Sequence, residues 1–266
     1  MYKRQGLSFI VRLAVPEGAS ADAVVVLLGA TVYLCAGLAA LRMPTDLLGP
    51  DPAELRTSVR TALSETFAGL AAGLRHLMER RVAARALASM TLMRFCYGAL
   101  TVMVLMLCRY AWAKSEADGL ALLGLAVGVS GAGFFVAAVF TPWAASRFGR
   151  LGWMAVCAAS AAVLEPALGL TFEPVPILIA AFVLGLTTQG AKIATDTVVQ
   201  SAVDDAFRGR IFSLYDVLFN IAFVGAAGVA ALMLPSDGRS VTLVVTVAAI
   251  YAATALALAV SRRQPQ

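Results

Sequence analysis

The chain has 266 residues, of which 60% are apolar and 14% are charged, and its mean hydropathy is +0.83. A soluble domain carries about 25% charged residues, so this composition excludes an ordinary soluble protein and predicts an integral membrane protein. The net charge of +5 does not indicate a nucleic-acid partner, because the arginines are concentrated in particular segments between apolar runs.

Seven apolar runs approach the roughly 20 residues that cross a bilayer as a helix. They lie at about 23–41, 86–108, 119–143, 151–170, 176–199, 211–234 and 241–260. The sequence therefore predicts an all-α protein with seven transmembrane helices and the lipid bilayer as a partner. Arginines precede the second run, follow the third and fifth, and end the chain, so the positive-inside rule places these segments in the cytoplasm. We expect a multi-pass protein of the cell (inner) membrane with a cytoplasmic C-terminus.

The first residues are too short to form a complete span. We interpret 1–22 as the truncated end of a preceding helix followed by an outer loop, with 1–5 as a candidate non-native scar, and 23–42 as the first complete span. The run 86–261 then holds the other six spans, and 262–266 forms a tail.

The polar segment 43–85 separates the first two spans. Asp51 to Glu54 provide a helix start signal, and apolar residues then recur every three or four positions. This pattern predicts an amphipathic helix on the inner membrane face or beneath the bundle. The alternative is two short linker helices broken near Gly69 or Gly73. Four basic side chains here are expected in solvent or at lipid headgroups: Arg75, His76, Arg80 and Arg81.

The second and third predicted spans each contain an unusual feature. Arg94 either snorkels to the membrane surface or meets an internal carboxylate. In the third span, Gly124 and Gly128 form a small-xxx-small pair that favours close helix packing. The GVSG of the same span resembles the nucleophile motif of rhomboid proteases, whose serine pairs with a later histidine. Because His76 is the only histidine and precedes this motif, we interpret GVSG as a packing feature.

Charged residues also occur inside the fifth and sixth predicted spans. A charge at the centre of a spanning helix costs about 2.5 to 3.5 kcal/mol, so it normally faces a partner or a water-filled cavity. Lys192 and Asp196 lie on one helix face, together with two glutamines of the same span, Gln189 and Gln200. Asp216 and Asn220 form a second polar stripe. The intervening DDAFRGR predicts a tight connection, so the two stripes should meet at one end of an antiparallel hairpin.

The remaining chemistry is sparse. The four cysteines lie in apolar runs without C-x-x-C spacing, and a single histidine makes a transition-metal site improbable. The chain contains neither a nucleophile with its base nor a glycine-rich phosphate loop. We therefore expect no catalytic residue, no metal and no cofactor, and we interpret the protein as a non-enzyme.

The decapeptide TPWAASRFGR stands between the third and fourth predicted spans. It resembles the loop signature of the major facilitator superfamily, in which a glycine and three residues precede Asp-Arg, any residue and Gly-Arg. Arg147, Gly149 and Arg150 match this signature, whereas Pro142 and Ser146 replace its first glycine and its acid. The run AGLRHLMERRVAARALASM resembles the exit of the central loop in the drug and siderophore exporter-like branch, and RGRIFSLYD resembles its tenth-to-eleventh helix connection.

This resemblance implies a fold in which 23–42 is helix six, 43–85 is the cytoplasmic central loop, and 86–261 is the C-terminal six-helix half of a facilitator. It also implies a charge latch in which Arg147 or Arg150 pairs with Asp196, with Asp216 as a further gating charge. The remaining membrane-embedded polar residues become candidates for the lining of a substrate cavity: Arg94, Gln189, Lys192 and Asn220.

The implied function is that of the C-terminal part of a secondary active transporter, an efflux-type permease that works by alternating access. Its partners would be the missing N-terminal half, a small-molecule substrate and protons as a candidate coupling ion. The alternative is a membrane scaffold or receptor subunit that transports nothing. Solvent accessibility of cysteines placed at 189, 196 and 220 would separate the two.

Overall fold

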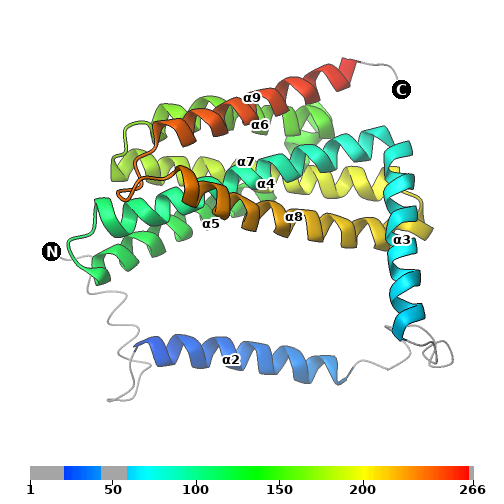
Figure 1. Cartoon of the computed structure of the whole chain (residues 1–266), viewed down its shortest axis with the longest axis horizontal. Coiled ribbons are helices and arrows are strands. Elements are labelled where there is room, and N and C mark those ends of the chain that lie inside the picture. The colour runs from blue at the N-terminus through cyan, green and yellow to red at the C-terminus, as the bar shows by residue number, and fades with distance from the viewer. Residues whose placement is uncertain (1–20, 43–58, 264–266) are drawn as a thin grey trace. The chain divides into compact units, whose positions relative to one another are not determined.

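The computed structural model describes residues 21–42 and 59–263, which form helices and short turns (Figure 1). The chain divides into two compact units, Met1–Leu63 and Ser64–Gln266. The first unit contains α2, Ala21–Ala40, a helix of 20 residues at the position of the first predicted span. Its crossing of the membrane remains a prediction. The expected truncated helix and scar, the Asp51 to Glu54 start signal and the end of the tail lie outside the described residues.

The second unit contains six helices that are long and apolar enough to cross a membrane, and these confirm the helical membrane fold. The first is α4, Arg81–Met106, which continues into a π-helical turn, η2, Leu107–Ala111. The others are α5, Glu116–Phe148; α6, Arg150–Gly169; α7, Pro174–Ala202; α8, Asp205–Met233; and α9, Val241–Arg263.

The helices extend further into the connections than we expected. Helix α5 continues through Pro142 to Phe148, so only Gly149 separates it from α6. Gly149 has φ 75° and ψ 157°, a conformation that is essentially restricted to glycine. Most of the predicted DDAFRGR connection is likewise helical, because α8 begins at Asp205. The predicted tight connection is therefore present but shorter than DDAFRGR, and the segment that resembles a loop signature is helical except for Gly149.

Helix α7 is the central element of the bundle and packs against α4, α5 and α6. Its contact with α5, which we call the α5–α7 seam, depends on glycines, which have no side chain. A Cβ on Gly185 would collide with the backbone carbonyl of Ser130, and a Cβ on Gly133 would collide with that of Phe182. The predicted packing pair is wrong in its residues, since Gly124 and Gly128 both face open space.

Helix α3, Val59–Glu79, precedes α4 and is helical throughout. It passes through Gly69 and Gly73 without a break, and its placement at the inner membrane face or beneath the bundle remains a prediction. Both glycines lie beside the Arg210 side chain of α8. The absent glycine side chains allow this approach, and the chain turns only at Arg80, where α4 follows.

Candidate functional site

Helix α4 places Arg94 against aromatic side chains. The guanidinium carbon lies 4.1 Å from the centre of the Phe219 ring, 4.4 Å from Phe223 and 5.1 Å from Tyr97. Its Nε atom is buried and has no hydrogen-bond partner in the described part of the chain. We expected an internal carboxylate or a snorkelling side chain at this position. Three π-faces, which attract a cation, take the place of that carboxylate.

Helix α7 carries an ion pair between residues one turn apart. The Nζ atom of Lys192 lies 2.9 Å from a carboxylate oxygen of Asp196, and the two side chains are 34% and 29% exposed. In this structure Asp196 therefore pairs with Lys192, and its expected pairing with Arg147 or Arg150 remains a prediction. Lys192 stands four residues before Asp196 on α7, and side chains at this spacing are neighbours on a helix surface. The Lys192 ammonium can therefore reach the Asp196 carboxylate without any movement between helices.

One aromatic ring joins these two groups. Besides its contact with Arg94, Phe219 of α8 lies 6.0 Å from the Lys192 ammonium, and Tyr215 of the same helix lies 5.6 Å from it. We call the combined set, from α4, α7 and α8, the cation–aromatic face: Arg94, Tyr97, Lys192, Asp196, Tyr215, Phe219 and Phe223. It contains two cations and one carboxylate, so its formal charge is positive.

The other predicted lining residues lie on the same helices. Gln189 is half-buried on α7, within a turn of Lys192. Asp216 and Asn220 are exposed on α8, and the Asn220 side-chain amide donates a 2.8 Å hydrogen bond to the backbone carbonyl of Asp216. The predicted stripe of α8 is therefore present, but its two side chains do not bind Lys192 or Arg94.

The two signature arginines lie at an end of the bundle. Arg147 is exposed at the end of α5, and Arg150 begins α6. The Arg150 guanidinium donates a 2.6 Å hydrogen bond to the hydroxyl of Ser201 and a 3.5 Å bond to the carbonyl of Thr197. Arg150 thus joins the start of α6 to the last turns of α7.

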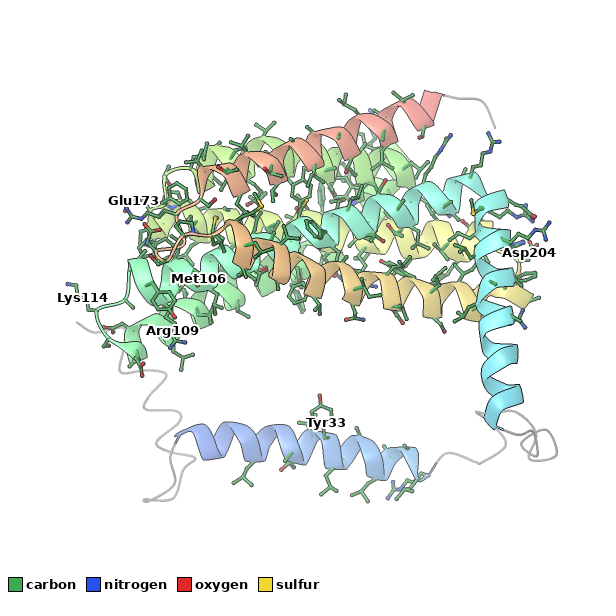
Figure 2. All side chains as sticks on the ribbon, viewed as in Figure 1. Tyr33, Met106, Arg109, Lys114, Glu173 and Asp204 are labelled. Carbon is green, nitrogen blue, oxygen red and sulfur yellow. The ribbon has the colours of Figure 1, made fainter. Side chains whose placement is uncertain are left out.

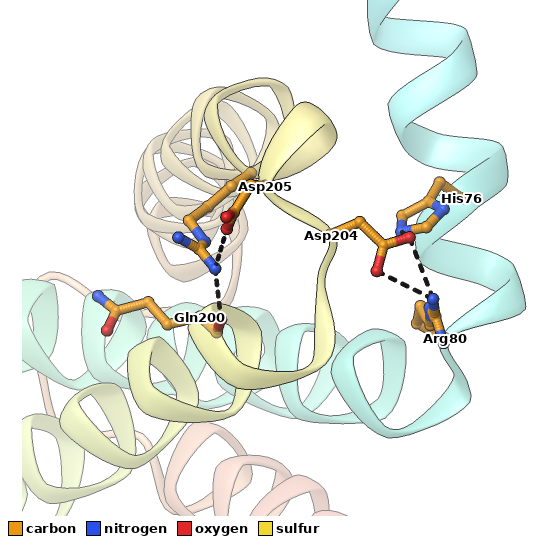
Figure 3. A network of polar contacts seen from close by, with 6 residues as sticks. His76, Arg80, Gln200, Asp204 and Asp205 are labelled. Carbon is orange, nitrogen blue, oxygen red and sulfur yellow. Dashed lines mark hydrogen bonds and ion pairs between the residues drawn. The ribbon is translucent and has the colours of Figure 1, made fainter.

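A polar cluster at the same bundle end connects α3 to the turn between α7 and α8 (Figure 3). Asp204 accepts two hydrogen bonds of 3.0 and 3.1 Å from Arg80, and it lies 3.5 Å from Nε2 of His76. The His76 ring also stacks on Phe207 with centroids 4.4 Å apart. His76 and Arg80, which we expected in solvent or at lipid headgroups, therefore both contact Asp204 of this turn.

Charges differ between the two ends of the bundle. Figure 2 labels Asp204 at one end and Arg109, Lys114 and Glu173 at the other. The Asp204 end also holds the starts of α4, α6 and α8 and the ends of α5 and α7, which together carry seven arginines: Arg80, Arg81, Arg85, Arg147, Arg150, Arg208 and Arg210. This asymmetry is the kind that orients membrane proteins, with the basic end on the cytoplasmic side.

The sequence interpretation missed Glu165. This residue of α6 is 4% exposed, and its Oε1 atom has no hydrogen-bond partner among the described residues. It lines a cavity of about 60 Å³ together with Tyr97 and Ser130, whose hydroxyls lie 3.5 Å apart. The available signal was a lone acid inside the fourth apolar run, and an ionisable residue within a span is a functional candidate by default.

The chain is similar to two curated proteins, one from Mycobacterium bovis and one from Mycobacterium tuberculosis. Each is 32% identical to it over 238 residues, which cover 89% of this chain and 52% of the relative. Both are named as uncharacterized MFS-type transporters. The chain thus spans about half the length of these relatives.

No protein-family model matches the chain. No solved structure matches it either. The six apolar helices and the two relatives make it a multi-pass membrane protein related to transporters named for the major facilitator superfamily.

Proposed function

We propose that this chain is the C-terminal part of a major facilitator superfamily transporter, which exports a small molecule by alternating access. The similarity to two MFS-type transporters over about half of their length supports this proposal, as does the six-helix bundle preceded by a basic segment. In such transporters two repeats rock about a site between them, so a substrate contacts both. The second wall would come from an N-terminal half of about six helices.

The observation that carries the proposal is the cation–aromatic face. Its Lys192–Asp196 pair is about one-third exposed, and Asp216 and Asn220 on α8 are exposed as well. Lipid is a poor environment for such groups, because charged side chains in membranes normally face water or another protein. In a cavity formed with the N-terminal half, these charged side chains would contact water in one state of the transporter and substrate in the other.

Cysteine labelling tests this role. In a background in which the four native cysteines are replaced, single cysteines at 189, 196 and 220 should react with a membrane-impermeant maleimide when the chain is co-expressed with its N-terminal half. Val163 on α6, 65% exposed and flanked in the sequence by Ala162 and Leu164, supplies the matched control and should remain unlabelled. A protein partner that covered the three positions permanently would leave them unlabelled, as the scaffold alternative requires.

Gating is the second part of the proposal. We place the moving contact of Arg150 at Ser201, and no longer at Asp196, because the former bond links the start of α6 to the end of α7. Arg147 and Asp216 remain candidate gating charges. Arg150→Gln should change the extent of maleimide labelling at 189, 196 and 220 from each side of the membrane. Unchanged labelling from both sides would contradict a gating role for Arg150.

Proton coupling is the third part. Glu165 is a buried carboxyl whose Oε1 has no hydrogen-bond partner among the described residues, and it lies beside a cavity that exceeds the space one water molecule needs. Such a group can carry a proton within the membrane, where its charged form is costly. Glu165→Gln should abolish transport driven by a pH gradient and spare the exchange of substrate across a membrane without one. Retention of gradient-driven flux would remove Glu165 from the mechanism.

Location and orientation complete the proposal. We place the basic bundle end and the C-terminus in the cytoplasm of a cell with this transporter in its inner membrane. Reporter fusions at Asp118 and Gln266 should then report opposite sides. The same side for both fusions would contradict the orientation and the arrangement of six spans between them.

A further inference from the structure

A cleft of about 950 Å³ opens at the basic end of the bundle, where α4 and α6 begin and α5, α7 and α9 end. Three arginines from two helices line it: Arg81, Arg85 and Arg150. The hydroxyl-bearing residues Ser201 and Ser261 lie among them, and no carboxylate belongs to the lining residues. The described residues that line the cleft therefore combine hydrogen-bond donors with positive charge.

The three arginines lie close enough in the cleft for their positive charges to reinforce one another. Arg81 and Arg85 stand one turn apart on α4, a spacing at which like charges repel each other. Arg150 lines the cleft from α6, where its guanidinium donates a 2.6 Å hydrogen bond to Ser201. Within the described residues, neither Arg81 nor Arg150 takes part in an ion pair. An anion between the two helices would relieve this repulsion.

The chemistry of the lining indicates which anion fits. Planar guanidinium groups bind phosphate oxygens through paired hydrogen bonds. Apolar side chains also line the cleft, among them Phe148, Leu151 and Val198. The cleft lies at the end that we place on the cytoplasmic leaflet, where basic pockets between membrane helices meet anionic lipid.

We propose that this cleft binds a phosphate-bearing anion through Arg81, Arg85 and Arg150. The phosphate can belong to an anionic phospholipid headgroup or come from solution, and the two sources predict different competition. The cleft at the opposite bundle end provides a contrast. It has a volume of about 580 Å³ and is lined by Arg109 and Lys114, but also by the carboxylate of Glu116.

The test is lipid binding to the whole chain in detergent, followed by native mass spectrometry. Phosphatidylglycerol should bind more tightly than phosphatidylcholine. The variant R81Q/R85Q/R150Q should lose about fivefold in phosphatidylglycerol affinity for each arginine removed. The matched control R109Q/K114Q should bind as the parent does. R81Q and R150Q alone should each show the smaller loss, which keeps the test decisive if the triple variant does not fold.

Inorganic phosphate, added as a competitor, distinguishes the two sources. If phosphatidylglycerol remains bound, the ligand is a lipid headgroup; if it is displaced and phosphate itself binds in an arginine-dependent way, the ligand comes from solution. Lipid and phosphate binding that are both unaffected by the arginine variants would overturn the proposal. That result would leave the substrate-cavity role untouched, since no lining residue of the cleft belongs to the cation–aromatic face.

Discussion

Gly185 and Lys192 lie on the same face of α7, two turns apart, in opposite surroundings. Gly185 lies against the backbone of α5 at Ser130, so closely that no side chain fits. Lys192 is one-third exposed, pairs with Asp196 and lies near two rings of α8. Helical periodicity therefore identifies a face, whereas the crossing of a neighbouring helix decides whether a given turn of that face is dry or polar.

The largest effect is expected at the dry turn. Gly185→Leu should destabilise the fold by about 3 kcal/mol or more, because the new side chain must displace the backbone of α5. Gly128→Leu on α5 is the matched control, since its position faces open space and the change should be nearly neutral. Thermal unfolding in detergent measures both. Equal unfolding temperatures for the two variants would show that the α5–α7 seam is no more sensitive to added side-chain volume than an open position on α5.

The next effect is expected at the polar turn. Asp196→Asn leaves the Lys192 ammonium without its carboxylate and should cost about 1 to 3 kcal/mol, the range for a hydrogen bond to a charged group. The exchange K192D/D196K rebuilds the pair on the same helix and should recover part of the loss in the same unfolding assay. No recovery would mean that Asp196 contributes through a different contact.

A smaller effect is expected from the ring that Arg94 shares with Lys192. In a double-mutant cycle, Arg94→Gln and Phe219→Leu should show a coupling of about 0.5 to 2 kcal/mol, as cation–π contacts do. Phe95, which is half-buried on α4 and has no ring contact with Arg94 among the described residues, supplies the control partner. Additivity in the Arg94–Phe219 cycle would show that the rings merely pack.

The smallest effect is expected at the bundle end. The Arg80 and Asp204 side chains are 47% and 58% exposed, so solvent screens their pair. Asp204→Asn should therefore cost no more than about 1 kcal/mol. Asp205→Asn, which breaks only the contact with Arg208, serves as the comparison. A loss at Asp204 as large as that at Asp196 would show that exposure does not separate the two pairs.

Sequence reasoning could predict which faces are polar but not what meets them. The stripe of Lys192 and Asp196 is present, as is the amphipathic α3, because both depend on periodicity within one helix. The partner of Arg94 was missed, since aromatic residues of α8 are indistinguishable from ordinary apolar ones until the packing of α4 against α8 is known. The connection before Asp205 was predicted, but its length was overestimated because acids are favourable both in loops and in the first turn of a helix.

The single-residue turn at Gly149 constrains how the protein enters the membrane. Arg147 and Arg150 flank this glycine, and arginines near the ends of spans are retained on the side from which insertion begins. The two helices are not separated by a polar segment long enough to be moved across the bilayer separately. We therefore expect helices α5 and α6 to insert together as a hairpin, with their shared turn staying on one side of the bilayer.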